Sequence, residues 1–180
     1  MKITFASGIK PYKIPKMVLL EVFNEHKIFK ADRHFLAINI KDSLPCGEIK
    51  LSTRKGSYHL PDYDGNILMI SKIESYKQNQ GIGKGMINFA KHFSKQNGCN
   101  GEIVLFADCS LTPKRVPHLF YRKQGFTTLN KIKDFKMDMF IKKNKDATWD
   151  DFSSMRMFYS PSMQKEKPLS QKIKEFFARI

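Results

Sequence analysis

The sequence predicts a mixed α/β (α+β) domain in which helices flank a central sheet. Several short segments alternate apolar and polar residues, as half-buried strands do. Other segments carry apolar residues at helical spacing. In the middle of the chain an apolar segment runs into a glycine turn and then into a helical pattern. With 180 residues, of which 41% are hydrophobic, the chain can bury one core.

The expected elements follow one another along the chain. Strands are expected at 2–9, 34–41, 47–54, 66–74, 102–107 and 134–142. Helices are expected at 16–31, 82–97 and 117–124. We find no internal repeat, so these elements form one domain with an extension at its end.

Local signals justify these elements in order. Residues 16–31 space their apolar residues mostly as a helix does, whereas 47–54 alternates like a half-buried strand. Residues 102–107 are nearly all apolar, which is typical of a buried central strand. Pro117 and Gly125 mark the start and end of the short helix. The segment 134–142 alternates again and is expected to be the last strand.

The chain is basic, with a formal net charge of +15. Such a surface attracts anions, among them nucleic acid, anionic lipid and phosphorylated cofactors. Most of the excess is lysine, in a sequence that is also rich in Ile and Asn. A solvated lysine-rich surface is therefore an equal alternative to a selected basic patch.

Cysteine spacing and hydropathy predict a reduced, cytoplasmic protein. Cys46, Cys99 and Cys109 show no CxxC spacing, and the five histidines are scattered, so no metal site is expected. No apolar run approaches the ~20 residues that span a bilayer. We therefore expect no membrane span.

The stretch Gln78–Met86 reads QNQGIGKGM and stands between an expected strand and an expected helix. A helix N-terminus leaves amide N–H groups unpaired, and glycines let a phosphate approach them closely. Lys84 adds a positive charge. The pattern is GxGxG and matches neither the P-loop nor the dinucleotide fingerprint. By itself it predicts either a phosphate cradle or a turn without a ligand.

A second motif follows about forty residues later, where Phe120–Phe126 reads FYRKQGF. The two motifs together resemble the GCN5-related N-acetyltransferase family. The first matches that family's [Q/R]-x-x-G-x-[G/A] loop at residues 78–83, and the second matches its [L/F]-Y-x-x-x-G-F pattern. The resemblance covers roughly residues 34–142 and implies a mainly antiparallel sheet with a splayed pair at its fourth and fifth strands.

The resemblance implies acetyl-coenzyme A as co-substrate, bound in the gap of the splayed pair. It implies that the backbone of Ile73 and Ser75 holds the pantetheine arm. The implied pyrophosphate ligands are the amides of Gln80, Gly81, Ile82, Gly83, Lys84 and Gly85. Family members often carry Asn where this chain has Lys114, and Ala where it has Pro117. Lys114 and Lys123 are then candidates for cofactor phosphate or, equally, parts of a solvated basic edge.

The resemblance also implies a proton donor, Tyr121, for the departing thiolate. A phenol within hydrogen-bond reach can supply that proton. The attacking amine must be neutral, and Glu74, at the end of the fourth strand, is the candidate base unless its strand position points it away. Asp64 and Asp108 are alternative carboxylates at the border of the cleft.

The implied function is acetyl transfer to a primary amine by direct attack in a ternary complex. The acceptor is left open among a small molecule, a protein and an aminoacyl-tRNA, the last as in the toxin branch of the family. A non-catalytic acyl-coenzyme A sensor is a further alternative, and a homodimer is an open possibility. Residues 1–143 form the expected acetyltransferase domain and 144–180 a C-terminal extension.

The extension ends in a predicted amphipathic helix at 170–180. Its apolar residues, Ile173, Phe176, Phe177 and Ile180, fall on one helical face. The helix either packs on the domain or serves as a partner-binding or membrane-surface helix.

Overall fold

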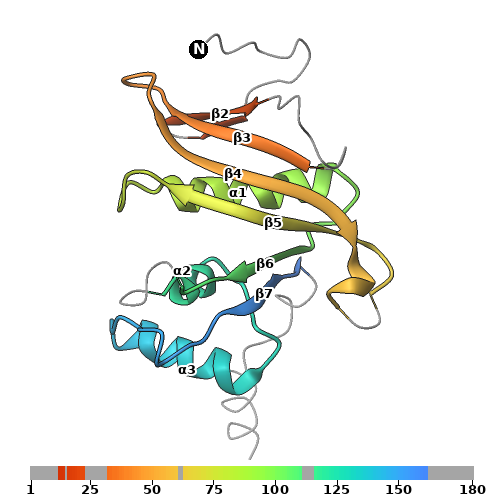
Figure 1. The fold of residues 1–180 in the computed structure, drawn as a ribbon, viewed down its shortest axis with the longest axis vertical. Coiled ribbons are helices and arrows are strands. Elements are labelled where there is room, and N and C mark those ends of the chain that lie inside the picture. Colours follow the sequence, from red (N-terminus) through yellow and green to blue (C-terminus); the bar gives the residue numbers. More distant parts are fainter. Residues whose placement is uncertain (1–11, 15, 23–31, 61–62, 111–115, 162–180) are drawn as a thin grey trace, which may run out of the picture.

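The computed structural model describes residues 12–14, 16–22, 32–60, 63–110 and 116–161. These residues form one seven-stranded sheet with three helices (Figure 1). The strands are β1 (Tyr12–Ile14), β2 (Met17–Val22), β3 (Asp32–Asn39), β4 (Pro45–Lys55), β5 (Asn66–Ser75), β6 (Ile103–Ala107) and β7 (Met155–Tyr159). The helices are α1 (Ile82–Gln96), α2 (His118–Lys123) and α3 (Lys131–Lys142), and a 3-10 turn spans Gly56–Tyr58. No helix in this described part is long and apolar enough to cross a membrane.

The strand order follows the chain, from β1 to β7. Every neighbouring pair is antiparallel except β5 and β6, which are parallel and are connected through α1. This confirms the mixed, mainly antiparallel sheet with flanking helices. The predicted fourth and fifth strands are β5 and β6 of the sheet.

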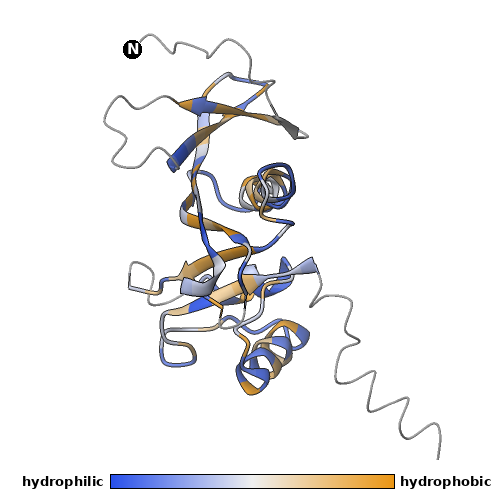
Figure 2. Ribbon diagram, turned by 90° about the vertical axis from the view of Figure 1, so that its right-hand side faces the viewer, coloured by the Kyte–Doolittle hydropathy of each residue, from blue (hydrophilic) through white to orange (hydrophobic). Residues whose placement is uncertain are grey.

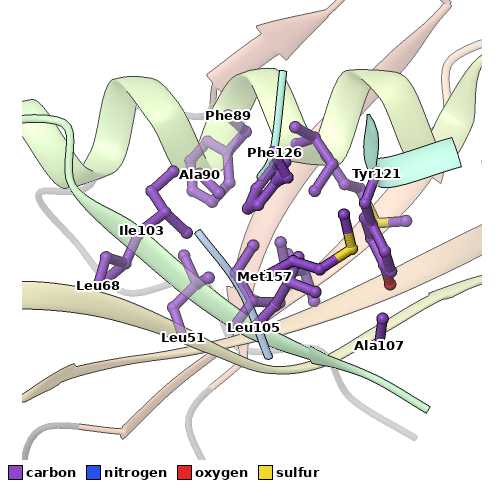
Figure 3. Close-up of a cluster of buried hydrophobic side chains, with 14 of the residues drawn as sticks. Leu51, Leu68, Phe89, Ala90, Ile103, Leu105, Ala107, Tyr121, Phe126 and Met157 are labelled. Atoms are coloured by element: carbon purple, nitrogen blue, oxygen red, sulfur yellow. The ribbon is translucent and has the colours of Figure 1, made fainter. Parts of the chain in front are cut away.

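Helix α1 packs on one face of the sheet, across β4, β5 and β6. Phe89 and Phe93 of α1 pack against the ring of Phe35 on β3. A large buried cluster joins these rings to apolar side chains of the sheet, of α2 and of β7 (Figure 3). Its labelled members are Leu51, Leu68, Phe89, Ala90, Ile103, Leu105, Ala107, Tyr121, Phe126 and Met157.

Two sequence-based predictions of element type are wrong. Residues 17–22 form strand β2 instead of the start of a helix, and β2 pairs with both β1 and β3. Residues 131–142 form helix α3 instead of a strand. The side chain of Asn130 caps α3 by accepting hydrogen bonds from the amides of Ile132 and Lys133. The expected strand at 2–9 and the helix at 170–180 lie outside the described residues.

The last strand of the sheet is β7, which pairs with β6 and, through an isolated bridge, with Thr127. The sequence assigned no strand to this segment. The sheet therefore continues beyond residue 143, and the predicted extension contributes a strand to it.

Candidate active site

Strands β5 and β6 separate after three residue pairs, Leu68 to Ile70 with Ile103 to Leu105. A bulge follows at once, because Lys50 of β4 pairs with Lys72 whereas Leu51 pairs with Ile70. The extra residue, Ser71, bends β5 away from β6. Between Ser71 and Ser75, β5 pairs with β4 on one side only among the described strands. Its backbone on the other side borders the gap.

The glycine stretch forms the turn between β5 and α1. Asn79 and Gly81 adopt left-handed backbone conformations, with φ of 59° and 76°. Gly81 is the N-cap residue of α1, and among the described residues no side chain caps this helix. The first-turn amides therefore have no intrahelical acceptor, and amides in this arrangement suit an anion.

A cavity of about 410 Å³ joins the free edge of β5 to these amides. Its walls come from four places: the end of β5, the glycine turn, the first turn of α1 and helix α2 with the residues before it. The lining residues are Ile73, Ser75, Lys77, Gln78, Asn79, Gln80, Gly81, Ile82, Gly83, Lys84, Val116, Pro117, Phe120 and Tyr121. The fold thus brings the two sequence motifs together in the lining of one cavity.

Tyr121 is the one ionisable group that the cavity takes from α2. Its side chain packs against Phe120 and Phe126, and the residue is only 8% exposed. Burial raises the pKa of Tyr121 to about 12. Figure 3 shows its hydroxyl on the Ala107 side of the cluster, at the end of β6. The phenol is therefore protonated at neutral pH and lies near the end of β6.

Most of the predicted cofactor ligands line this cavity, but the described residues Gly85 and Lys123 do not. The amide of Gly85 donates a hydrogen bond of 2.9 Å to the carbonyl of Gly81, so α1 itself uses the donor that was assigned to phosphate. Lys123 is in the last turn of α2, outside the lining. Lys114 lies outside the described residues.

Glu74 also stays outside the cavity. Ile73 and Ser75, its neighbours in the strand, do line the cavity. Because side chains alternate along a strand, the Glu74 carboxylate is on the opposite face of β5. There it pairs with Lys72 at 3.0 Å. Lys72 also pairs with Glu48 on β4, and these two carboxylates raise the pKa of Lys72 well above its usual value.

Asp108, one of the alternative carboxylates, follows β6 directly. It accepts hydrogen bonds from Ser110 and Ser154. Hydrogen bonds from the Ser110 amide and hydroxyl and from Ser154 lower the pKa of Asp108, which makes it a weaker base.

Six lining residues had no predicted role in the site: Lys77, Gln78, Asn79, Val116, Pro117 and Phe120. Lys77 supplies a cation beside the glycine turn and pairs with Asp42 at 3.5 Å. Phe120 was part of the second motif but had no assigned role. Its ring lies against Gly83, a contact between distant parts of the chain that no local pattern reveals.

Comparisons with known proteins give fold-level likenesses only. No family model matches the chain. No curated protein matches it either. Among solved structures, it is similar to a transcriptional regulator from Bacillus halodurans C-125, with 19% identity, TM-score 0.46, and 58% of this chain and 65% of that one covered. It is similar to the PaiA N-acetyltransferase from Thermoplasma acidophilum in complex with coenzyme A, with 17% identity, TM-score 0.45, and 72% and 61% covered.

A third likeness is to NAA60 from Arabidopsis thaliana in complex with a bisubstrate analogue, with 11% identity, TM-score 0.48, and 73% and 77% covered. The chain spans 65% and 61% of the length of the first two structures. The sheet itself gives the clearer description: its order is sequential, its one parallel pair splays apart, and a glycine turn leads from that pair into α1. This is the fold of the GCN5-related N-acetyltransferases.

Proposed function

We propose that the cavity binds acetyl-coenzyme A and that the protein transfers the acetyl group to a primary amine by direct attack in a ternary complex. One observation carries this proposal. The same cavity joins unpaired helix N-terminal amides, a free strand edge and a buried protonated phenol.

Three parts of the cavity support this proposal, because each suits a different part of the co-substrate. A pyrophosphate suits the amides from Gly81 to Lys84, where the helix end is positive and Lys77 adds a cation. A pantetheine arm, which carries two amides, suits the unpaired backbone of β5 at Ile73 and Ser75. The thioester would then lie toward the inner end of the gap, near Tyr121.

The reaction needs two proton movements and no covalent enzyme intermediate. The amine nitrogen attacks the thioester carbonyl carbon, and the carbon–sulfur bond breaks. Tyr121 donates its proton to the departing sulfur. The proton of the amine passes to a base, for which Glu74 is our candidate, because an acceptor entering from the face opposite α1 would meet that carboxylate. Tyr121 regains a proton from solvent before the next turnover.

A second candidate, an aminoacyl-tRNA acceptor, is favoured by a pair of side chains beside the gap. Phe106 follows the last residue of β6 that pairs with β5, and it is an exposed aromatic on the sheet. Arg156 of β7 lies directly across from it. An exposed ring next to a guanidinium suits a nucleobase and its phosphate.

Isothermal titration with acetyl-coenzyme A tests the cavity, and thiol release with a panel of amines tests the reaction. We expect micromolar binding and turnover with at least one amine. Absence of binding would refute the assignment of the cavity. Binding without turnover on small amines, peptides and aminoacyl-tRNA alike would instead favour a sensor. An acceptor RNA should also bind more weakly as salt rises, whereas a neutral small amine should not.

A further inference from the structure

Helix α3 has two apolar faces, one of which is turned outward. Met137 is fully buried and Phe140 packs against the core on the inner side. On the outside, Ile132 is 80% exposed and Phe135 is 63% exposed. We call the exposed apolar residues of this helix and the turn before it the outer stripe: Leu129, Ile132, Phe135 and Met139.

Helix geometry separates this stripe from the core. At about 100° per residue, Ile132, Phe135 and Met139 fall within about 60° of one another. Met137 falls roughly 160° from their centre, on the opposite side. The helix lies at one end of the molecule, next to α2 and outside the sheet (Figure 1). Apolar and polar colours both appear around its ribbon (Figure 2).

Lysines border the outer stripe. By the same helical geometry Lys131 and Lys142 lie along one edge and Lys136 and Lys143 along the other. Lys131, Lys142 and Lys143 form no ion pair with another described residue, and all three are exposed. Their charges are therefore available to an anionic partner.

The aspartates of this region are largely occupied. Arg122 pairs with Asp134 and Asp138 on the α2 side of the helix. Lys136 pairs with Asp151. Asp146 and Asp150 are exposed on the loop after α3. The edge of the stripe is consequently more cationic than the loop behind it.

The only tryptophan of the chain, Trp149, belongs to a turn that packs on α3. It is 57% exposed on the turn from Thr148 to Asp151. The turn is held to α3, because Lys136 donates a hydrogen bond of 3.0 Å to the carbonyl of Asp151 and the Phe140 and Phe152 rings are in contact. An exposed tryptophan beside aliphatic side chains and lysines is the composition of an interfacial membrane contact.

We propose that the outer stripe and Trp149 bind the surface of an anionic phospholipid membrane. Apolar side chains would enter the headgroup boundary while the lysines meet lipid phosphates. A second copy of the chain would bring two lysine borders together. The 170–180 segment would also add cations, because it carries Lys172, Lys174 and Arg179 against one Glu175. Nucleic acid would leave the aliphatic side chains without an apolar partner.

Vesicle cosedimentation of the full chain tests the proposal, with Trp149 as the built-in fluorescent probe. The vesicles contain phosphatidylcholine alone or with phosphatidylglycerol, at about 0.05 M and about 0.5 M salt. We expect binding to the anionic vesicles at low salt, with a blue shift of the tryptophan emission, and much weaker binding at high salt or without phosphatidylglycerol.

The variants assign the binding surface. Phe135→Ser should weaken partitioning about tenfold or more, since a phenylalanine side chain leaves water on binding. Replacing Lys142 by Gln should weaken it about fivefold. Tyr58→Ser is the control, because Tyr58 is an aromatic residue that is 78% exposed in the 3-10 turn and is not part of the outer stripe. This variant should leave partitioning unchanged.

Three results would overturn the proposal. The first is the absence of partitioning into anionic vesicles. The second is unchanged partitioning of folded Phe135→Ser. If partitioning is then lost in the Phe176→Ser/Phe177→Ser variant, the membrane contact belongs to the 170–180 segment. The third is a concentration-dependent dimer, measured by sedimentation, that Phe135→Ser abolishes. Acetyl-coenzyme A binding does not enter any of these readouts, so they stand apart from the proposed function.

Discussion

Gly83 lies directly against Phe120, since a Cβ at Gly83 would be 3.2 Å from Cζ of that ring. The first turn of α1 and the helix α2 therefore meet at the cavity, and a side chain at position 83 would press on the Phe120 ring. A glycine here keeps the amides of the turn accessible and lets the second motif approach the first. The contact places the two motifs side by side in the lining of one cavity.

Replacing Gly83 by Asp should abolish acetyl-coenzyme A binding. The new side chain would crowd Phe120 and put a carboxylate where the pyrophosphate is expected, and such like-charge contact costs several kcal/mol. We expect at least about a 100-fold rise in Kd by isothermal titration. Asn88→Asp adds the same charge to an exposed position of α1 and is the matched control. Equal weakening by both variants would mean that the turn does not hold the phosphates.

Tyr121→Phe should lower kcat while leaving the affinity for acetyl-coenzyme A nearly unchanged. The variant keeps the ring that packs on Phe126 and removes only the proton donor. General acid catalysis of this kind is worth about 10²- to 10⁴-fold. The measurement is thiol release under saturating co-substrate, with Tyr159→Phe as the control. If Tyr121→Phe turns over at the wild-type rate, the proton comes from elsewhere.

Tyr121 should also make the protein sensitive to alkali. Its pKa is about 12 in the folded chain, against about 10 when unfolded. Because the folded pKa is the higher one, the protonated phenol contributes to the free energy of unfolding. This contribution is complete below about pH 10 and is lost as the pH rises to about 12. The two-unit difference corresponds to about 3 kcal/mol.

Urea unfolding at pH 8 and pH 11 measures this effect as the difference between wild type and Tyr121→Phe. Other tyrosines and lysines ionise in both proteins and cancel. The wild type should lose stability relative to the variant between these pH values. A constant difference would show that the phenol is not desolvated.

Glu74→Gln should lower kcat by about 10²-fold or more if its carboxylate takes the amine proton. Asp108→Asn is the comparison, because hydrogen bonds already lower the pKa of Asp108. The rate should be followed across pH with one amine. A profile in which Asp108→Asn, and not Glu74→Gln, loses activity would transfer the base role to Asp108.

The sequence predicted many of the residues that line the cavity, but it assigned two of the surrounding elements to the wrong type. The glycine turn and helix α1 depend on local backbone chemistry, so residues 78–84 could be assigned to one loop directly. Val116 reaches the same cavity only through tertiary packing. Which face of β5 carries the Glu74 side chain depends on the alternation of side chains along the strand. The bulge at Ser71 shifts this alternation, and no local sequence pattern predicts the bulge.

The errors in element type have a physical cause in each case. Helix α3 was predicted as a strand because apolar residues on two opposite helical faces, such as Met137 and Met139, imitate alternation along the chain. The cap at Asn130 was the signal that could have corrected it. Strand β2 is a short apolar run, and such runs do not distinguish a strand from a buried helix.

Gly47 of β4 should be intolerant of even a small side chain. A Cβ there would be 2.6 Å from the carbonyl oxygen of Glu74 and 3.1 Å from side-chain atoms of Ile82 and Met86. This glycine lets the start of α1 lie close on β4 and β5, so it sets the position of the glycine turn. Gly47→Ala forces backbone to move and should cost about 1–3 kcal/mol of unfolding free energy.

Urea unfolding measures that cost, with Lys50→Ala as the control at an exposed position of the same strand. Because the displaced helix carries the turn, Gly47→Ala should also weaken acetyl-coenzyme A binding in protein that is still folded. Unchanged stability and unchanged binding would show that α1 does not depend on this close approach. Loss of stability with intact binding would separate the packing of α1 from the geometry of the cradle.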